Sequence, residues 1–172
     1  MGGQIALHYA AHHPGRLGRL VVVDSTLRLS PERLALMHAR GARQSSYGTL
    51  DDLVERYKLM PAGSTAPPEV TRHIARHAGR QSPDGRWRHK FDRNVYAQRG
   101  QIDLVPLFAR IAVPTLLVKA ELNARLTAEI AAEVKAVAPQ VDLVEVPGSG
   151  HHVMLDNPAV LAAEIRAFLA RH

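Results

Sequence analysis

The stretch VEVPGSGHHVMLDNP, residues 144–158, decides how the rest of the chain is interpreted. Its apolar start has the pattern of a strand, the Pro- and Gly-rich part that follows is typical of a loop, and Pro158 after Asn157 indicates a helix start. The loop therefore carries His151 and His152. A histidine on a loop after a strand is a candidate general base, because rigid scaffolds usually present such residues on loops. The alternative is that both histidines are polar loop residues without a role.

Length and composition favour a folded domain. The chain has 172 residues, of which 46% are apolar, enough for one domain with a core. The absence of cysteine excludes a disulfide framework, a thiol nucleophile and a thiolate metal site. No apolar run approaches the roughly 20 residues of a membrane span, and no signal pattern opens the chain. We expect a soluble, cytoplasmic protein without a membrane partner.

The net charge of +6 arises from 22 Lys and Arg against 16 Asp and Glu, and the basic residues are densest between Arg72 and Arg99. A nucleic-acid-binding protein can have this charge. However, the aromatic residues are few and do not alternate with the arginines as a stacking platform requires. We therefore expect no nucleic-acid partner, and we interpret the basic segment as a solvated face or as a mouth that favours anionic ligands.

Helix and strand patterns alternate at both ends of the chain. Continuous apolar runs typical of buried parallel strands occupy 20–24, 113–118 and 141–146. A helix with small residues is predicted over 1–13, and an amphipathic helix closes the chain over 158–171. This alternation predicts an α/β fold. The glycines at the start of the first helix are costly there and suggest a chain cut from something larger.

The middle of the chain has helical periodicity broken by turns. We expect short helices throughout 30–101, with an ambiguous segment at 87–96, and a further helix over 103–111. The resulting organisation has an inserted helical lid at 30–101 between two parts of a core, 1–29 and 102–172.

Three motifs, in this order, resemble the C-terminal two-thirds of an α/β-hydrolase. Met1-Gly2-Gly3 resembles the end of the Gly-x-Ser-Met-Gly-Gly nucleophile elbow, 113–118 resembles the penultimate strand, and 148–151 (Gly-Ser-Gly-His) resembles the catalytic-histidine loop. The resemblance covers essentially the whole chain. It implies a partial α/β-hydrolase fold, with the last three parallel strands, flanking helices and an inserted helical lid.

The resemblance implies that His151 is the base of a catalytic triad and that His152 is a neighbour that packs or caps. The backbone amide of Met1 would belong to the oxyanion hole. The family's nucleophile stands immediately before the residue that matches Met1. We therefore expect the chain to be a truncated form of a hydrolase, inactive as written because the nucleophile is missing.

The acid of the triad departs from the usual pattern. The family usually places an aspartate a few residues after the penultimate strand, but 120–125 contains none. Some members, haloalkane dehalogenases among them, use an acid after the strand that follows the elbow helix, where Asp24 stands. We expect Asp24 to orient His151, with Glu121 as the alternative acid and Asn123 able at most to hydrogen-bond the ring. The alternative for Asp24 is a strand-end aspartate that only hydrogen-bonds the following turn.

Three functional hypotheses follow. The first is a serine-type, esterase-like hydrolase of an ester, lactone or similar small acyl substrate, which the Met-Gly-Gly tripeptide favours. The second is an aspartate-nucleophile enzyme such as a haloalkane dehalogenase or epoxide hydrolase. The third is a non-catalytic binding or interaction module. If the chain is stable alone, we expect it to self-associate through the unpaired edge of strand 20–24 or to rearrange its N-terminal helix over that edge.

No cofactor or metal is expected. His8 with His12, and His73 with His77, have the spacing of two ligands on one helix face. Neither pair has the glutamate of a His-Glu-x-x-His motif or an evident third ligand. Both pairs are interpreted as solvated helix histidines.

Overall fold

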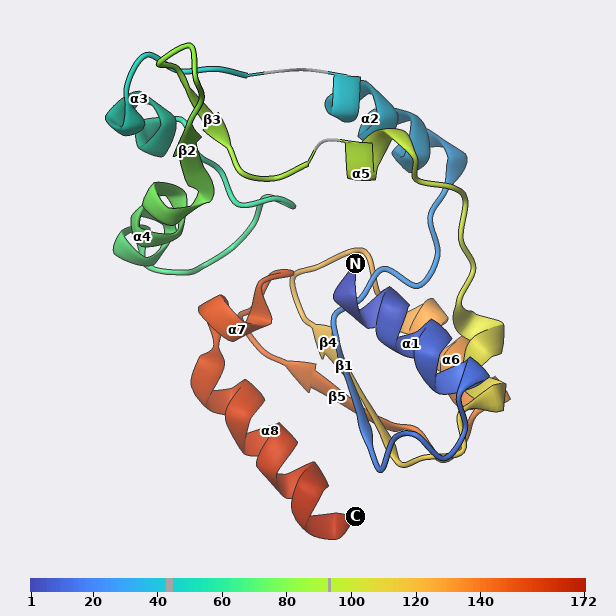
Figure 1. The fold of residues 1–172 in the computed structure, drawn as a ribbon. Coiled ribbons are helices and arrows are strands. Elements are labelled where there is room, and N and C mark those ends of the chain that lie inside the picture. The colour runs from blue at the N-terminus through green and yellow to red at the C-terminus, as the bar shows by residue number, and fades with distance from the viewer. Residues whose placement is uncertain (43–44, 93) are drawn as a thin grey trace. The chain divides into compact units, whose positions relative to one another are not determined.

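The computed structural model describes residues 1–42, 45–92 and 94–172, and the chain forms two units (Figure 1). The core unit is assembled from three stretches of chain, Met1–Leu29, Gly63–Thr65 and Ile102–His172. The inserted unit is assembled from two, Ser30–Ala62 and Ala66–Gln101. Gly63–Thr65 thus belongs to the core unit although it lies in the middle of the insertion. No helix within the described ranges is both long and apolar enough to cross a bilayer.

The core unit is built on a parallel sheet of three strands in the order β1-β4-β5. The strands are β1 (Leu20–Val23), β4 (Thr115–Ala120) and β5 (Asp142–Val146). Leu117 of the central strand is level with Val22 on one side, and both side chains are fully buried. The expected partial α/β fold with its last three parallel strands is confirmed.

One face of the sheet is covered by α1 (Gly2–His12), the 3₁₀ helix η1 (Val105–Arg110) and α6 (Ala128–Val137). Phe108 of η1 is fully buried in this layer. The small residues of α1 let the helix approach β1 closely. The predicted helix over 103–111 is shorter and of 3₁₀ type. Asp103 Oδ1 accepts from Val105 N at its start, and the proline at 106 stands in the first turn, where a missing backbone donor is tolerated.

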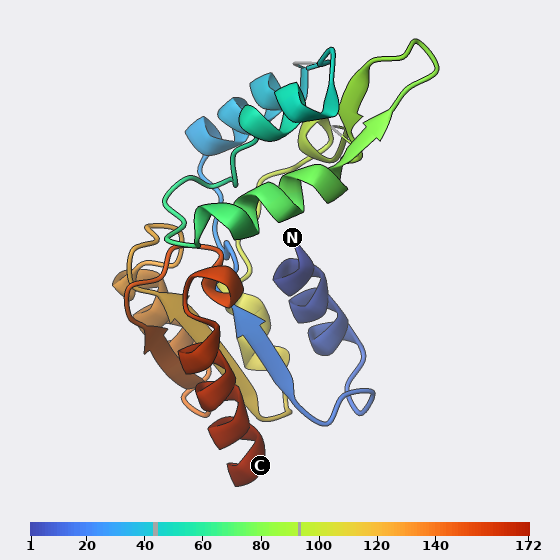
Figure 2. The same cartoon turned by 90° about the vertical axis from the view of Figure 1, so that its left-hand side faces the viewer.

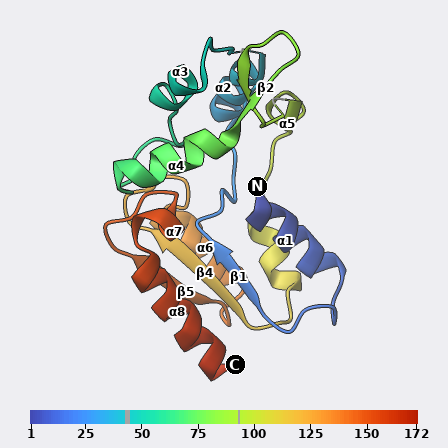
Figure 3. The same ribbon diagram turned by 60° about the vertical axis from the view of Figure 1, so that its left-hand side comes forward.

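The opposite face is covered by the short helix α7 (Val153–Asp156) and by α8 (Pro158–Arg171), as Figures 2 and 3 show for α8. Phe168 of α8 packs there against the alternate side chains of β4, those of Leu116 and Val118. Successive β4 side chains therefore enter opposite layers, as the pleat of a strand requires. α7 was not predicted, because four residues are too few to show a helical period.

Two helices of the core unit begin at capping side chains, and the predicted start at Asn157 is confirmed by its cap. Thr127 Oγ1 accepts a hydrogen bond from Ile130 N at the start of α6, at 3.3 Å. Asn157 Oδ1 accepts one from Val160 N at the start of α8, at 3.4 Å. These side chains satisfy backbone donors that have no partner inside the helix.

The two connections that join the core unit to the insertion are paired with each other. Leu29 N donates to Ile102 O at 3.1 Å. Beside this contact the guanidinium of Arg28 pairs with Asp103 at 3.0 Å and with Glu133 of α6 at 2.7 Å. The hydrogen bonds to these carboxylates raise the pKa of Arg28, and Arg28 in turn lowers the pKa of Glu133.

The inserted unit contains four helices and two strands among its described residues. In chain order these are α2 (Pro31–Ala42), α3 (Leu50–Glu55), α4 (Pro68–Ala78), β2 (Gly79–Gln81), β3 (Trp87–His89) and α5 (Asn94–Ala97). The expectation of helices throughout missed the antiparallel hairpin of β2 and β3, whose turn contains Gly85 with a φ of +78°. Strands of three residues are too short to show alternation. Arg93, in the segment predicted as ambiguous, lies outside the described residues.

Candidate active site

The candidate site lies at the carboxyl edge of the sheet, where β1 and β5 both end. Asp24 follows β1 directly, and its backbone N–H donates to Val118 O at 2.7 Å. Its φ of +42° then turns the chain away from the sheet. A left-handed conformation costs a non-glycine residue about 1–2 kcal/mol, so the surrounding contacts hold Asp24 in place. The sequence carries no signal for this conformation.

Asp24 and His151 are in direct contact. His151 Nδ1 lies 2.9 Å from Asp24 Oδ2, and the aspartate is 0% exposed, whereas 26% of the histidine side chain is exposed. A carboxylate oxygen can only accept here, so the pairing assigns the ring proton to Nδ1. Nε2 is then the nitrogen that can accept a proton.

Two further donors reach the buried carboxylate. Ala120 N donates to Asp24 Oδ1 at 3.1 Å, and the side-chain amide of Asn123 donates to Asp24 Oδ2. A buried carboxylate is costly unless it is hydrogen-bonded, and these contacts meet that requirement. The Asn123 amide therefore contacts the acid, whereas the sequence analysis allowed it at most a contact with the imidazole.

Glu121 is engaged with the loop that carries His151. Its Oε2 accepts a hydrogen bond from Gly148 N at 2.7 Å. Gly148 has a φ of +62°, a conformation that glycine adopts at little cost. In the described contacts, Glu121 thus braces the loop backbone, and Asp24 is the carboxylate on the ring.

Asp156 holds the same loop from its other side, a role that the sequence analysis missed. Its Oδ2 accepts from Gly150 N at 2.8 Å, and its Oδ1 accepts from Thr65 N at 3.0 Å and from the Ser64 hydroxyl. Thr65 Oγ1 also donates to the carbonyl of Gly148 at 3.1 Å. No local pattern could have linked Asp156 to residues about ninety positions away.

The histidine loop and Gly63–Thr65 approach each other so closely that a glycine is required. A Cβ placed on Gly150 would lie 2.4 Å from the carbonyl oxygen of Gly63. His152 packs against the site from within the loop, with its ring edge-on to that of His151 at 5.3 Å between centroids. The position of His151 therefore depends on tight packing on several sides.

The first turn of α1 lies at the same edge of the sheet. Gln4 Nε2 donates to Thr26 O at 2.7 Å, and a Cβ on Gly3 would lie 2.8 Å from Ser25 Oγ. Ser25 and Thr26 follow Asp24, so these contacts bring the start of α1 next to the acid. Met1 caps this turn, because its carbonyl accepts from Gln4 N at 3.0 Å.

The described residues contain no group of three or more His, Cys, Asp or Glu side chains that could hold a metal ion. In the two histidine pairs, His12 Nδ1 lies 2.8 Å from His8 O, and His77 Nδ1 lies 2.8 Å from His73 O. One ring nitrogen of each pair therefore contacts its own helix.

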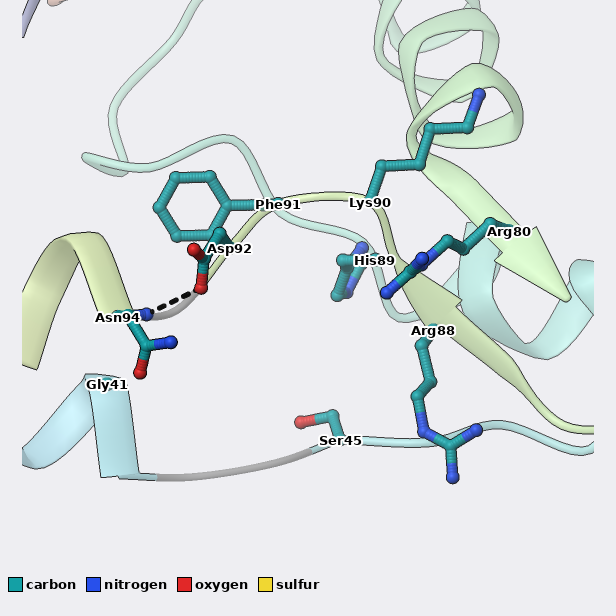
Figure 4. Close-up of a pocket in the computed structure, with 9 residues that line it drawn as sticks. All are labelled: Gly41, Ser45, Arg80, Arg88, His89, Lys90, Phe91, Asp92 and Asn94. Atoms are coloured by element: carbon teal, nitrogen blue, oxygen red, sulfur yellow. Dashed lines mark hydrogen bonds between the residues drawn. The ribbon is translucent and has the colours of Figure 1, made fainter. Parts of the chain in front are cut away.

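The inserted unit contains a hollow of about 430 Å³ beside the hairpin (Figure 4). Its lining is rich in basic side chains and consists of Gly41, Ser45, Arg80, Arg88, His89, Lys90, Phe91, Asp92 and Asn94. The guanidinium of Arg88 donates to both carboxylate oxygens of Asp84 and holds the pKa of that carboxyl well below its usual range. Asp92 accepts from Asn94 N at 2.9 Å.

The excess of positive charge belongs to the inserted unit. This unit has 13 Lys and Arg against 7 Asp and Glu, whereas the core unit has 9 against 9. The core unit is therefore formally neutral, and the whole net charge of +6 resides in the insertion.

Comparison with known proteins places this geometry in a family. The model of the Alpha/beta hydrolase family matches residues 1–164. A 2-(acetamidomethylene)succinate hydrolase of Mesorhizobium japonicum is 28% identical over 172 residues, which cover 98% of this chain and 61% of that protein. The chain thus spans about three-fifths of the length of this relative.

Solved structures agree with the sequence match. The structure of an E-2-(acetamidomethylene)succinate hydrolase has a TM-score of 0.80 at 24% identity, over 98% of this chain and 63% of that one. A hydrolase from Rickettsia typhi, described as putative, has a TM-score of 0.82 at 17% identity, over 100% and 60%. An esterase from Mycobacterium tuberculosis has a TM-score of 0.73 at 24% identity, over 98% and 57%. At these identities the structural likeness shows the fold alone, whereas the family model shows the family. The chain therefore belongs to the alpha/beta hydrolase family.

Proposed function

We propose that this chain supplies the base and the acid of an esterase-like α/β hydrolase that acts on an ester, lactone or similar acyl compound. The observation that carries the proposal is the hydrogen bond of 2.9 Å from His151 Nδ1 to the fully buried Asp24. A base needs a fixed tautomer and an accessible nitrogen; the contact with Asp24 fixes the tautomer, and the His151 side chain is 26% exposed. The other ring nitrogen of His151, Nε2, is the proton acceptor.

The nucleophile of the proposed reaction is a serine immediately before Met1, in a longer protein. This proposal is supported by the position of the α1 start beside Ser25, and by the share of the relative's length that the chain spans. The Met1 backbone amide then donates to the oxyanion. The segment Ser30–Gln101 acts as the lid over the substrate.

The proton moves through His151 in both halves of the reaction. Nε2 takes the serine proton as the oxygen attacks the carbonyl carbon, and it returns the proton to the leaving alcohol when the acyl–oxygen bond breaks. A water molecule then attacks the acyl carbon and gives a proton to Nε2. As the bond from the acyl carbon to the serine oxygen breaks, Nε2 returns this proton to that oxygen, which releases the acid and regenerates the serine. Asp24 stabilises the imidazolium in both steps without itself taking the proton.

We infer further that the acyl substrate is anionic. The whole excess of positive charge resides in the insertion, which also contains a hollow lined partly by Arg80 and Lys90. The similar Mesorhizobium protein is named for a succinate, which carries two carboxylates. A positive potential raises the local concentration of an anionic substrate. The kcat/KM for an anionic ester should therefore fall more with added salt than the kcat/KM for a neutral ester.

An aspartate nucleophile, as in a haloalkane dehalogenase or epoxide hydrolase, is the second candidate. The observation that favours it is the place of the acid, since Asp24 follows the strand after α1. The residue before Met1 separates the two candidates. Hydrolysis of an acyl-serine puts the oxygen of labelled water into the product acid, whereas hydrolysis of an aspartyl ester puts it into the enzyme's own carboxylate.

A third candidate is a chain that functions by associating with a second copy through the edge of β1. Within the described residues β1 pairs only with β4, and α1 leaves Ile5 64% and Tyr9 41% exposed. An unpaired edge beside apolar side chains favours pairing with a second copy. Light scattering of the 172-residue chain tests this idea, and a monomeric mass at high concentration would contradict it.

The decisive experiment on catalysis begins with the DNA upstream of the Met1 codon. We expect an open frame that encodes Gly-x-Ser before Met1, and the longer chain should hydrolyse p-nitrophenyl esters and react with a fluorophosphonate. His151→Gln should lower kcat by about 10³-fold or more, while the matched variant His152→Gln keeps most of the activity. An upstream stop codon, or full activity in His151→Gln, would refute the proposal.

A further inference from the structure

The turn that follows β4 lacks the acid that the family usually has there, yet it is in contact with the acid of this chain. Asn123 stands three residues after the end of β4, and its side-chain amide donates to Asp24 Oδ2. The same oxygen faces His151 Nδ1 at 2.9 Å. The Asn123 amide and the His151 imidazole therefore contact the same oxygen of Asp24.

We propose that Asn123 is a positioning residue that orients Asp24 for His151. The inference rests on the proposed function, because it assigns a role within that reaction. Asp24 Oδ1 is held by Ala120 N at 3.1 Å, and Oδ2 is held by the Asn123 amide. With one donor from the β4 side on each oxygen, the plane of the carboxylate is set independently of His151.

The same turn also positions the histidine loop. Glu121 accepts from Gly148 N at 2.7 Å, and Leu122 N donates to Ser149 O at 3.0 Å. Three successive residues thus hold the two partners of the pair: Glu121 and Leu122 hold the loop, and Asn123 holds the acid.

An amide suits this position better than a carboxylate would. The Nδ2 group donates and carries no charge, so it stabilises the ionised, acceptor form of the buried Asp24. An aspartate at 123 would bring a second negative charge against the first, and like charges so close in a buried site disfavour joint ionisation. The choice of asparagine is therefore linked to the location of the acid on the neighbouring strand.

Because Asn123 contacts Asp24 directly, we expect the asparagine and the aspartate to be exchangeable between positions 24 and 123. Because Asn123 and His151 meet at one oxygen of Asp24, a carboxylate at 123 is within a side-chain adjustment of the ring. In the double variant Asp24→Asn/Asn123→Asp, the amide and the carboxylate change places. A residue with only a structural role would not support such an exchange.

The first test uses the 172-residue chain and needs no activity. In ¹H–¹⁵N NMR, the Nδ1 proton of His151 should resonate far downfield and exchange slowly with water, as expected for a proton held by a carboxylate. We expect Asn123→Ala to broaden or remove this signal, while Ala124→Ser, at an exposed neighbouring position, leaves it unchanged. An unaltered signal in a folded Asn123→Ala protein would overturn the inference. If Asn123→Ala does not fold, Asn123→Ser, which keeps a polar group but cannot reach Asp24, takes its place.

The second test uses the longer, active chain. Asn123→Ala should lower kcat by about 10- to 100-fold with little change in KM, since a hydrogen bond to a charged group is lost only within the catalytic pair. The exchange variant should exceed Asp24→Asn in kcat by about 10-fold, which independent single effects cannot produce. If kcat of the exchange variant equals the product of the effects of Asp24→Asn and Asn123→Asp, each measured alone, Asn123 does not position the acid. A longer chain without any activity would instead refute the proposed function, and the NMR result would still decide the contact.

Discussion

The substitution Gly150→Ala tests the packing on which the position of His151 depends. An alanine Cβ would lie 2.4 Å from the carbonyl oxygen of Gly63 and 3.0 Å from its carbonyl carbon. Both atoms are backbone, so no side chain can rotate away. An ordinary contact requires about 3.5 Å, and the two segments must therefore separate by roughly 1 Å.

The expected loss of stability can be worked out from the contacts that this separation affects. Overpacking costs about 1–3 kcal/mol, and the separation also stretches the 2.8 Å hydrogen bond from Gly150 N to the Asp156 carboxylate. A hydrogen bond to a charged group contributes about 1.5–3 kcal/mol. We expect Gly150→Ala to lower the free energy of unfolding by about 3 kcal/mol, a large share of a typical domain's stability of about 5–15 kcal/mol.

Urea unfolding followed by circular dichroism measures this loss in the 172-residue chain. The matched control is Gly18→Ala, because a Cβ at Gly18 meets no atom within 4 Å. The control should leave the midpoint almost unchanged or raise it slightly. If Gly150→Ala unfolds within about 0.5 kcal/mol of the control, Gly63 does not pack on the histidine loop and the argument fails. In the longer chain the same variant should also lower kcat about 10²-fold, the usual effect of a 1 Å misplacement.

Three further predictions concern the core unit. Gly3→Ala should lower the free energy of unfolding in urea by about 1–3 kcal/mol, because its Cβ would overlap the residue after Asp24, and Gly2→Ala, with no neighbour within 4 Å, is the control. Phe108→Ala should cost about 3–5 kcal/mol in the same assay, because the ring is fully buried, and a loss below 1 kcal/mol would show that the site is not packed. Arg28 lowers the pKa of Glu133, so the folded protein binds fewer protons there, and this stability is present above about pH 4.3 and is lost as the pH falls through the lowered value. Arg28→Gln should therefore flatten the fall in stability as the pH drops below about 4.3, and equal acid sensitivity of the two proteins would contradict this role.

The parts of the fold that the sequence predicted are those with local signals. Buried parallel strands have continuous apolar runs, which is why 20–24, 113–118 and 141–146 correspond to strands, with boundaries shifted by up to two residues. The start of the last helix was predicted for the same reason, because the local sequence contains its cap, Asn157. The short hairpin and the 3₁₀ helix were missed because they have too few residues for a period.

The candidate site likewise has residues that the sequence predicted and residues that it did not. The resemblance of 148–151 to a family motif directed attention to His151, and the vacant position after β4 directed it to Asp24. The structure contains the hydrogen bond between them, whereas their catalytic roles stay predictions. The contacts of Asn123 and Asp156 could not be predicted, since each joins residues more than ninety positions apart and depends on the folded backbone.

The return of the chain to the core unit at Gly63–Thr65 divides the insertion into two excursions, Ser30–Ala62 and Ala66–Gln101. Each excursion starts and ends on the core unit, so one can gain or lose residues in evolution without moving the anchors of the other. The entropy of closing a loop grows slowly with its length, so such changes cost little stability. Asp156, which contacts both the anchor at Gly63–Thr65 and the histidine loop, is the point that stays fixed when either excursion changes in length.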